Sequence, residues 1–395
     1  MEHGSVGERI AYWRRRRGLS QKLLAGLVGR SASWMTKVER GDRIVDKLSV
    51  LLALSYALKV DLGKLVGGVE LPPNGGGAVG SPPRGIVAVR RALFTVRPAD
   101  REPPAAAELR AGVDRAKRLR YDGRNEAVGI VLPELISDAR AAADQDAPDG
   151  WWCLAGAYQV ASSLARTVGE VDLALLAADR AVGAAQRSGD GLLVAVSERL
   201  LASSLIREGL LDEAGAVCSD AADVLAPTDA TPLEGWSVWG SLQLTGADVV
   251  VRGGDGVGAW RVLGNARDAG ERVGPGRNDY WEAFGPANVG VYEIMVALES
   301  GDPVEALRIA DTVEVDELPS AESRARFCIQ VARAHALDLD DVATVMLLLE
   351  AERHSAEAVR HSVLARELVR VCLSRERRSR TPGLRGLAER LGVLD

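Results

Sequence analysis

A six-residue pattern recurs along most of the chain, and this recurrence limits the possible folds more than any other feature. Each copy has a turn residue, then an acidic or polar position, and an Ala five residues after the turn residue. The Ala positions are separated by 47, 40, 45, 47 and 37 residues. Four copies are clear and two are weaker: "GEVDLA" (169–174), "GLLDEA" (209–214), "GDGVGA" (254–259) and "GDPVEA" (301–306), then "DGRNEA" ending at Ala127 and "DLDDVA" ending at Ala343.

Each copy opens a helical pattern and follows another apolar-periodic segment of helix length. The repeating unit is therefore a helix, a turn and a helix. One such hairpin cannot bury its apolar face alone, so residues 105–395 are predicted to form an α-solenoid of about six stacked hairpins. The repeats resemble tetratricopeptide repeats, whose second helix begins with a similar signature, although the period of about 34 residues in that family is shorter than the spacings here.

Composition agrees with an all-α fold. Hydrophobic residues make up 47% of the chain but aromatic residues only 4%, and Ala and Leu dominate over β-branched runs. The four cysteines lie far apart and form no C-x-x-C, which indicates reduced core thiols and no metal site. The sequence shows neither a signal peptide nor an 18-residue apolar stretch, so we expect a cytoplasmic protein without a membrane span.

Charge and Gly/Pro content divide the chain into parts. Residues 1–70 hold 13 Lys and Arg against 7 Asp and Glu, whereas the remainder is net −12. This asymmetry indicates that only the N-terminal part meets a polyanion. Residues 67–104 contain a Gly/Pro-rich stretch and read as a linker, with a short helix expected in "GIVAVRRALFTV".

Residues 5–66 are predicted to form five helices. The second begins after the N-cap Ser20, with Gln21 at its first position, and the third begins after the N-cap Ser31. The apolar stripe of the second helix is predicted from Leu23, Leu24, Leu27 and Val28, and the inward face of the third from Met35 and Val38. A short second helix, a turn and a third helix with a free outer face is the arrangement of a helix-turn-helix.

The pattern "GLSQ…AGLVGRS…SWMTKVERGDR" resembles the Cro/cI-type, or XRE, DNA-binding family over residues 5–66. By position, Gln21 is expected to grip a phosphate, and Lys37 and Ala32 to meet a guanine and a thymine methyl. The alternative is an ordinary solvated surface on a protein-interaction module. The full set of predicted DNA-contacting residues is Arg14, Arg17, Gln21, Ser31, Ala32, Ser33, Trp34, Thr36, Lys37 and Arg43.

One helix-turn-helix module supplies limited contact area. We therefore predict a homodimer on an inverted-repeat operator in double-stranded DNA, with half-sites about one DNA turn apart. The solenoid is the expected source of the dimer contact. The competing hypothesis is an antitoxin-like or scaffold protein, in which the solenoid binds a partner protein and no small effector.

The layout also resembles actinobacterial XRE regulators with tetratricopeptide-like bodies and pheromone-responsive regulators of other Gram-positive bacteria. That resemblance implies a short peptide or small effector on a concave surface lined by the first helix of each unit. The segment "NDYWEAFGPANV" matches this class, and Pro286 within it is expected to kink a helix. On that helix one side would carry Trp281, Phe284, Asn288 and Tyr292.

Two clusters are therefore candidates for effector contact. The first also includes Asn278 and Tyr280, and the second lies on the first helix of an earlier unit. The alternative is that both aromatic stripes are ordinary core. The candidate residues are Asn278, Tyr280, Trp281, Phe284, Asn288 and Tyr292 in the first cluster, and Tyr158, Gln159, Ser162 and Arg166 in the second.

Enzyme motifs are absent from the sequence. Residues 75–80, "GGGAVG", satisfy G-x-G-x-x-G, but prolines on both sides indicate linker and not a dinucleotide loop. The chain contains no G-x-x-x-x-G-K-[ST], H-E-x-x-H or G-x-S-x-G. We therefore expect no enzymatic activity and no cofactor.

Overall fold

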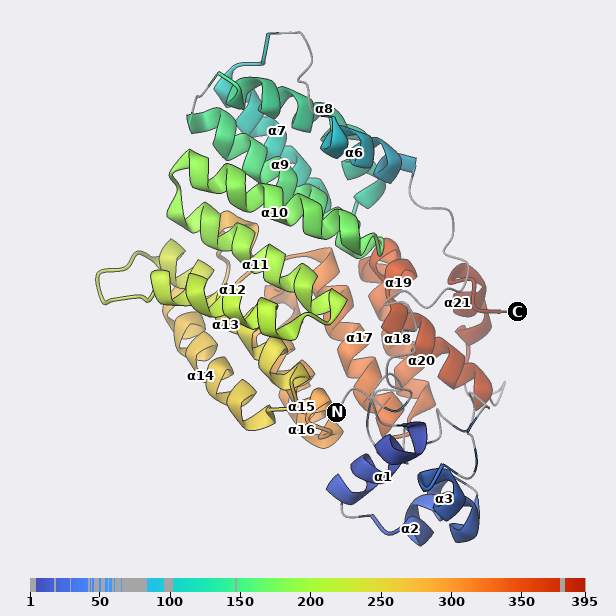
Figure 1. The fold of residues 1–395 in the computed structure, drawn as a ribbon. Coiled ribbons are helices and arrows are strands. Elements are labelled where there is room, and N and C mark those ends of the chain that lie inside the picture. Colours follow the sequence, from blue (N-terminus) through green and yellow to red (C-terminus); the bar gives the residue numbers. More distant parts are fainter. Residues whose placement is uncertain are drawn as a thin grey trace. The chain divides into compact units, whose positions relative to one another are not determined.

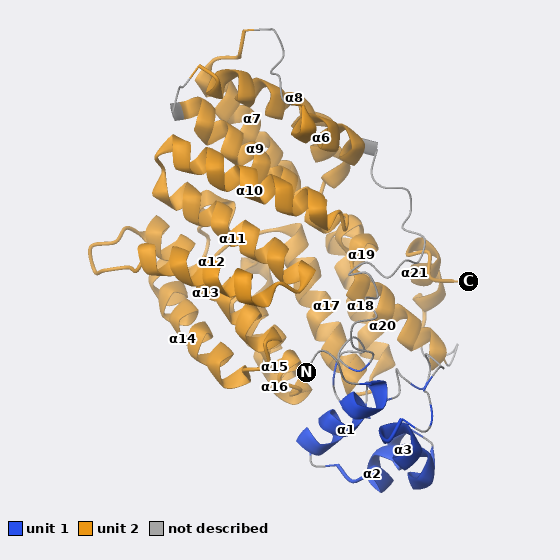
Figure 2. Ribbon diagram, in the orientation of Figure 1, with its two compact units in different colours: residues 1–77 blue, residues 78–395 orange. Residues whose placement is uncertain are grey.

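The computed structural model describes residues 5–17, 19–28, 30–41, 84–95, 102–145, 148–376 and 381–394, with isolated positions between 43 and 65. Within these ranges every regular element is a helix, which confirms the predicted all-α fold. The chain divides into two compact units, residues 1–77 and 78–395 (Figure 2). Each unit is described by itself below.

The first unit contains α1 (Val6–Arg16), α2 (Gln21–Leu27) and α3 (Ala32–Glu39). Each helix begins after a serine whose hydroxyl accepts a hydrogen bond from the amide three residues later, so the predicted caps at Ser20 and Ser31 are confirmed. The predicted fourth and fifth helices lie outside the continuously described residues. The buried core of the unit comprises Ile10, Leu24, Ala25, Met35, Val38, Val45, Leu54, Leu58 and Leu65.

The predicted apolar stripe of α2 is wrong in part. Leu24 is fully buried, but the side chains of Leu23 and Leu27 are 52% and 59% exposed. Leu23 and Leu27 are four residues apart and share a helix face, and that face points to solvent. Ala25 takes the place in the core that the sequence pattern gave to Leu23 and Leu27.

The second unit contains six helical hairpins among its described residues, as the recurrence predicted. They follow one another in chain order from α7 to α18 (Figure 1). The pairs are α7 (Ala106–Tyr121) with α8 (Asn125–Ala143), α9 (Pro148–Thr167) with α10 (Val171–Ser188), α11 (Gly191–Glu208) with α12 (Leu211–Val224), α13 (Leu233–Arg252) with α14 (Gly256–Val273), α15 (Pro286–Glu299) with α16 (Pro303–Ala310), and α17 (Ala321–Leu337) with α18 (Asp341–His354).

Shorter elements precede, interrupt and follow the hairpins. Two 3₁₀ turns occur, one before α15 and one before α17, and three helices complete the C-terminal end. In chain order these elements are α6 (Arg84–Phe94), η1 (Asp279–Trp281), η2 (Val315–Glu317), α19 (Ala356–His361), α20 (Val363–Ser374) and α21 (Leu384–Arg390).

The recurring Ala marks the fourth residue of the second helix in each clear copy. There it is completely buried, at Ala174, Ala214, Ala259 and Ala306. In the two weaker copies the motif Ala is one position too early and is only partly buried. The fourth residues of α8 and α18 are Val128 and Thr344, and these are the side chains that are fully buried there. The repeat therefore selects a small or β-branched side chain four residues after the cap.

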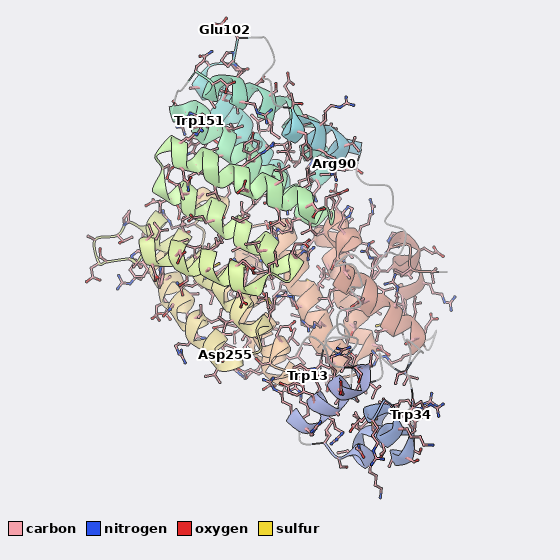
Figure 3. All side chains as sticks on the ribbon, in the orientation of Figure 1. Trp13, Trp34, Arg90, Glu102, Trp151 and Asp255 are labelled. Atoms are coloured by element: carbon pink, nitrogen blue, oxygen red, sulfur yellow. The ribbon has the colours of Figure 1, made fainter. Side chains whose placement is uncertain are left out.

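The turn before each second helix requires a left-handed backbone. The residue that precedes the N-cap has a positive φ in all six hairpins, and in five it is a glycine, for example Gly209 (φ 79°) and Gly254 (φ 92°). Asp255, the N-cap of α14 (labelled in Figure 3), follows Gly254. Its carboxylate accepts a hydrogen bond from the Gly258 amide at 2.8 Å. In the sixth hairpin the left-handed residue is Leu339 (φ 65°). That conformation is unfavourable for a side chain with a Cβ.

Replacing Leu339 by Gly should therefore raise the free energy of unfolding by about 0.5–1 kcal/mol. The left-handed conformation costs a non-glycine residue about 1–2 kcal/mol, and the larger entropy of an unfolded glycine offsets about 0.5–1 kcal/mol of the gain. The side chain is 68% exposed, so little packing is lost. The matched control is Gly209→Ala, whose Cβ would meet no atom within 4 Å and which should lose about 1 kcal/mol. Urea unfolding of the full chain checks both, and a Leu339→Gly variant no more stable than the parent contradicts the prediction.

Helix α6 confirms the short helix expected in "GIVAVRRALFTV". This helix was predicted to lie within the linker. Instead, the apolar face of α6 packs into the core of the second unit through Ile86, Val89 and Leu93. The approach to α8 is close, since a Cβ on Gly85 would lie 2.5 Å from the Cα of Gly129. Helix α6 therefore extends the hairpin array by one element.

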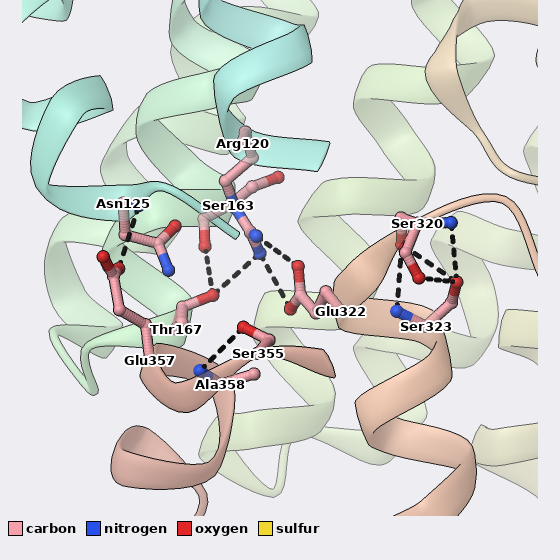
Figure 4. A network of polar contacts seen from close by, with 10 residues as sticks. All are labelled: Arg120, Asn125, Ser163, Thr167, Ser320, Glu322, Ser323, Ser355, Glu357 and Ala358. Carbon is pink, nitrogen blue, oxygen red and sulfur yellow. Dashed lines mark hydrogen bonds and ion pairs between the residues drawn. The ribbon is translucent and has the colours of Figure 1, made fainter. Parts of the chain in front are cut away.

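Polar contacts also connect the first hairpin of the array to helices near its C-terminal end. Arg120 of α7 forms a bidentate ion pair with Glu322 of α17, and its Nη2 also donates to the Thr167 hydroxyl at 2.8 Å (Figure 4). The backbone amide of Asn125 donates to the Glu357 carboxylate of α19 at 2.9 Å. The first hairpin thus contacts helices more than 200 residues further along the chain.

Two further sequence predictions are tested by the fold. All four cysteines are buried and form no disulfide, as expected. Among the described residues, no helix is long and apolar enough to cross a membrane.

Candidate DNA interface and effector cavity

The outer face of α3 is the candidate DNA interface. Its inner face is held in the core by Met35 and Val38, which are 0% and 1% exposed. On the other side Ala32, Ser33 and Lys37 are exposed. Ser31, which caps the helix, and Arg43, which follows it, are also exposed. These five residues form the outer face, and its one side-chain charge within α3 is the positive charge of Lys37.

Three of the predicted DNA-contacting residues instead connect the helices. Arg14 of α1 forms a bidentate pair with Glu39 of α3, at 2.6 and 2.9 Å, and its Nη1 donates to the Leu19 carbonyl. Gln21 donates to the same carboxylate at 2.7 Å and accepts from the Thr36 hydroxyl at 3.0 Å. We therefore do not assign DNA contacts to the Arg14 and Gln21 side chains.

This network has an electrostatic consequence for the interface. The Glu39 side chain is only 6% exposed. The charge of Arg14 neutralises it, and the same hydrogen bond to Glu39 raises the pKa of Arg14. The one carboxylate of α3 is thereby withdrawn from the surface that would face phosphates.

Arg17 and Trp34 are the remaining two of the predicted DNA-contacting residues. Arg17 donates from Nε to the Leu58 carbonyl at 3.1 Å, and burial lowers its pKa. The Arg17 guanidinium therefore connects the C-terminal end of α1 to the backbone at Leu58 within the first unit. Trp34, labelled in Figure 3, is half-buried against the core. The guanidinium of the exposed Arg30 lies 5.7 Å from the centroid of the Trp34 ring. That contact holds a cation beside the N-terminal end of α3.

A cavity of about 190 Å³ lies inside the second unit. Every helix that lines it is the first of its hairpin: α7, α9, α11, α13, α15 and α17. The segment that contains η1 forms part of the remaining wall. Six of the ten predicted effector residues line this cavity and so are brought together, namely Gln159, Arg166, Tyr280, Trp281, Asn288 and Tyr292.

The other four predicted residues are not among those that line the cavity. Asn278 accepts a hydrogen bond from the Ala283 amide at 3.0 Å and so shapes the η1 loop. Phe284 is buried against Gly240, where a Cβ would lie 2.1 Å from the ring. Tyr158 accepts from Arg140 at 2.8 Å, and Ser162 is completely buried.

The predicted kink at Pro286 is wrong. Pro286 is the first residue of α15, where the missing amide proton would have no helical partner in any case. The preceding residues therefore do not share a helix face with Asn288 and Tyr292. They form a loop in which Tyr280, Trp281 and Ala283 have φ values of 50°, 65° and 55°.

Side-chain contacts hold this strained loop against distant helices. The Tyr280 hydroxyl donates to the Asp190 carboxylate at 3.0 Å, and Glu282 forms a buried ion pair with Arg199 of α11. The Trp281 ring packs edge-to-face on Tyr121 of α7, with ring centroids 5.7 Å apart. Three non-glycine residues in the left-handed region indicate that the surrounding structure imposes the conformation, as is common at binding sites.

The sequence analysis missed most of the charged residues of the cavity. The missed residues come from α7, α11, α17 and the segment after η1, so no local motif connects them. The available signal was a charged residue at an inward position of a first helix, for example Lys117, which is only 7% exposed. Burial lowers the pKa of Lys117 to about 8. The missed residues are Lys117, Arg120, Arg199, Glu282, Glu322 and Arg326.

Comparison with known proteins identifies the fold of the first unit. Residues 5–65 match the family described as "Helix-turn-helix domain". Over most of its length, the chain is similar to the crystal structure of Bacillus thuringiensis PlcR in complex with the peptide PapR7 and DNA. The TM-score is 0.34 at 13% sequence identity, over 85% of this chain and 98% of that one. No curated protein sequence matches the chain.

Proposed function

We propose that this protein is a sequence-specific DNA-binding transcriptional regulator of the XRE type. The observation that carries the proposal is the helix-turn-helix match over residues 5–65, together with an outer face of α3 that is exposed and carries no free carboxylate. Ser31, Ala32, Ser33 and Lys37 are the residues that meet base edges or the adjacent phosphates. Arg43 of the same face and Arg30, which precedes α3, bind the DNA backbone.

The test is selection of sites from random double-stranded DNA by the purified full chain. We expect one enriched motif arranged as an inverted repeat, with half-sites about one helical turn apart, because the proposed DNA-bound form is a homodimer. Sedimentation of the protein on the selected site should give two chains per duplex. Recovery of no enriched motif contradicts the proposal, and one chain per site contradicts its dimeric part.

We further propose that the second unit controls DNA binding through an effector in the cavity. The support is a concave, polar cavity built from six first helices and a strained loop. A volume of about 190 Å³ is smaller than the roughly 300–1,000 Å³ of sites for drug-sized ligands. The cavity therefore suits a small molecule or the end of a short peptide.

Filling the cavity with a protein side chain should mimic an effector. Ser203 of α11 lines the cavity, and Ser203→Phe should change the Kd for the selected operator by at least about 5-fold, the lower end of ordinary coupling between sites. The matched control is Ser219→Phe on the exposed face of α12, which should leave the Kd unchanged. Fluorescence anisotropy measures both. Equal affinities for the two variants would show that the cavity does not communicate with DNA binding.

A further inference from the structure

The cavity concentrates positive charge inside an acidic unit. Five cationic side chains line it, against two carboxylates. The part of the chain after residue 70 is net −12, so this local excess is opposite in sign to its surroundings. The cations are Lys117, Arg120, Arg166, Arg199 and Arg326, and the carboxylates are Glu282 and Glu322.

The two carboxylates are already occupied by two of the cations. Glu322 pairs with Arg120, and Glu282 pairs with Arg199. A third cation, Arg326, donates to the Asn288 amide oxygen at 3.1 Å. These contacts leave no acidic group in the cavity lining to balance the remaining positive charge.

Two of the five cations, Lys117 and Arg166, have no ion-pair or hydrogen-bond partner among the described residues, and of these Lys117 has its ammonium 5.8 Å from the centroid of the Trp152 ring. The Nε of Arg166 is buried, and no described residue accepts a hydrogen bond from the Arg166 guanidinium or forms an ion pair with it. Burial, together with repulsion from Arg207 and Arg120, lowers the pKa of Arg166 to about 10. Arg166 is partly buried, and an unpaired charge in such a position is unfavourable, so this arrangement costs folding free energy that a bound anion would recover.

Two hydroxyl groups in the same cavity also lack partners. Ser241 is 4% exposed and its Oγ has no hydrogen bond, and the buried hydroxyl of Tyr121 likewise has no partner among the described residues. Both are O–H donors. A guanidinium fork with two hydroxyl donors matches the oxygens of a carboxylate or a phosphate.

We propose that the cavity binds an anionic group, a carboxylate or a phosphate, through Arg166 with the hydroxyls of Tyr121 and Ser241. The proposal rests on the effector function proposed above and names the chemical class of that effector. A small organic acid, a phosphate ester or the carboxyl terminus of a short peptide carries such a group. The anion replaces the missing counter-charge of Arg166.

The first test needs no ligand and uses Arg166→Gln in the full chain. Removing an unpaired, partly buried charge should raise Tm in chloride buffer by about 1–3 °C. If Arg166 contributed packing contacts alone, the same substitution would remove those contacts and lower Tm. The matched control is Arg261→Gln on α14, an exposed arginine outside the cavity lining, which should leave Tm unchanged.

The second test adds anions to the same proteins. Sodium succinate and sodium phosphate, compared with sodium chloride at equal ionic strength, distinguish a carboxylate site from a phosphate site. At least one should raise Tm of the wild type and of Arg261→Gln, and neither should raise Tm of Arg166→Gln. Arg166→Lys keeps the charge and should retain a weaker response, which separates loss of the site from damage to the fold.

Three outcomes would overturn the proposal. The first is an Arg166→Gln protein that is less stable than the wild type. The second is a wild type that responds to neither anion beyond chloride, and the third is an Arg166→Gln variant that responds as fully as the wild type. Both readouts are made without DNA, so their failure is distinct from failure of the regulator function, which operator binding and Ser203→Phe report.

Discussion

Replacing Ser33 and Lys37 together by Glu should lower the affinity for the selected operator by at least about 100-fold at physiological salt. Both side chains are exposed on the outer face of α3, and the change adds two carboxylates and removes one ammonium, a net change of −3, where phosphates and base edges would lie. Loss of one phosphate contact weakens binding and reduces its salt dependence, and new carboxylates add repulsion. The substitutions touch no buried residue, so Tm of the first unit should change little.

Fluorescence anisotropy against the selected duplex measures this effect at several salt concentrations. The control makes the same change in charge on the second unit, with Ser219→Glu and Arg261→Glu on the exposed faces of α12 and α14. That control should bind within about twofold of wild type, because neither residue belongs to the helix-turn-helix unit. Equal losses in the two double variants would mean that net charge, and not the face of α3, governs binding.

The second large effect is expected at the ion pair of Glu282 and Arg199 in the cavity wall. Glu282→Ala should lower the free energy of unfolding by about 3 kcal/mol or more, because it leaves Arg199 buried without its counter-charge. The two side chains are 3% and 17% exposed. Burial acts to lower the pKa of Arg199, but the charge and hydrogen bond of Glu282 outweigh it and raise the pKa.

A double-mutant cycle separates charge from packing in this prediction. Arg199→Met removes the orphaned cation, so Glu282→Ala combined with Arg199→Met should be more stable than Glu282→Ala alone. Urea unfolding of the four proteins gives the coupling energy. If the two losses simply add, the ion pair does not hold the strained loop, and the account of that loop fails.

The hairpin array could be predicted because its signal is local. Each turn needs a left-handed residue and a small side chain four positions after the cap, and both requirements recur within six residues of sequence. The weaker copies show the limit of this approach. At Val128 and Thr344 the buried position is kept although the motif Ala has moved by one residue.

The candidate sites were predictable only in part, since spacing alone does not show which partners a side chain meets. Gln21 occupies a position suited to a phosphate contact, yet Glu39, 18 residues away, engages its amide. Pro286 could end one helix or begin another, and the sequence pattern did not distinguish these. The cationic lining of the cavity depends on first helices that lie far apart in sequence, so only the assembled fold reveals that Arg166 lacks a partner.

The contact of α7 with α17 also determines how the second unit should unfold. An open row of repeats can fray from either end and lose its hairpins one after another, because each repeat meets only its neighbours. Here the pair Arg120–Glu322 and the hydrogen bond from Asn125 to Glu357 join the two ends. Neither terminal hairpin can detach without breaking long-range contacts, and the whole array should therefore melt as one cooperative block.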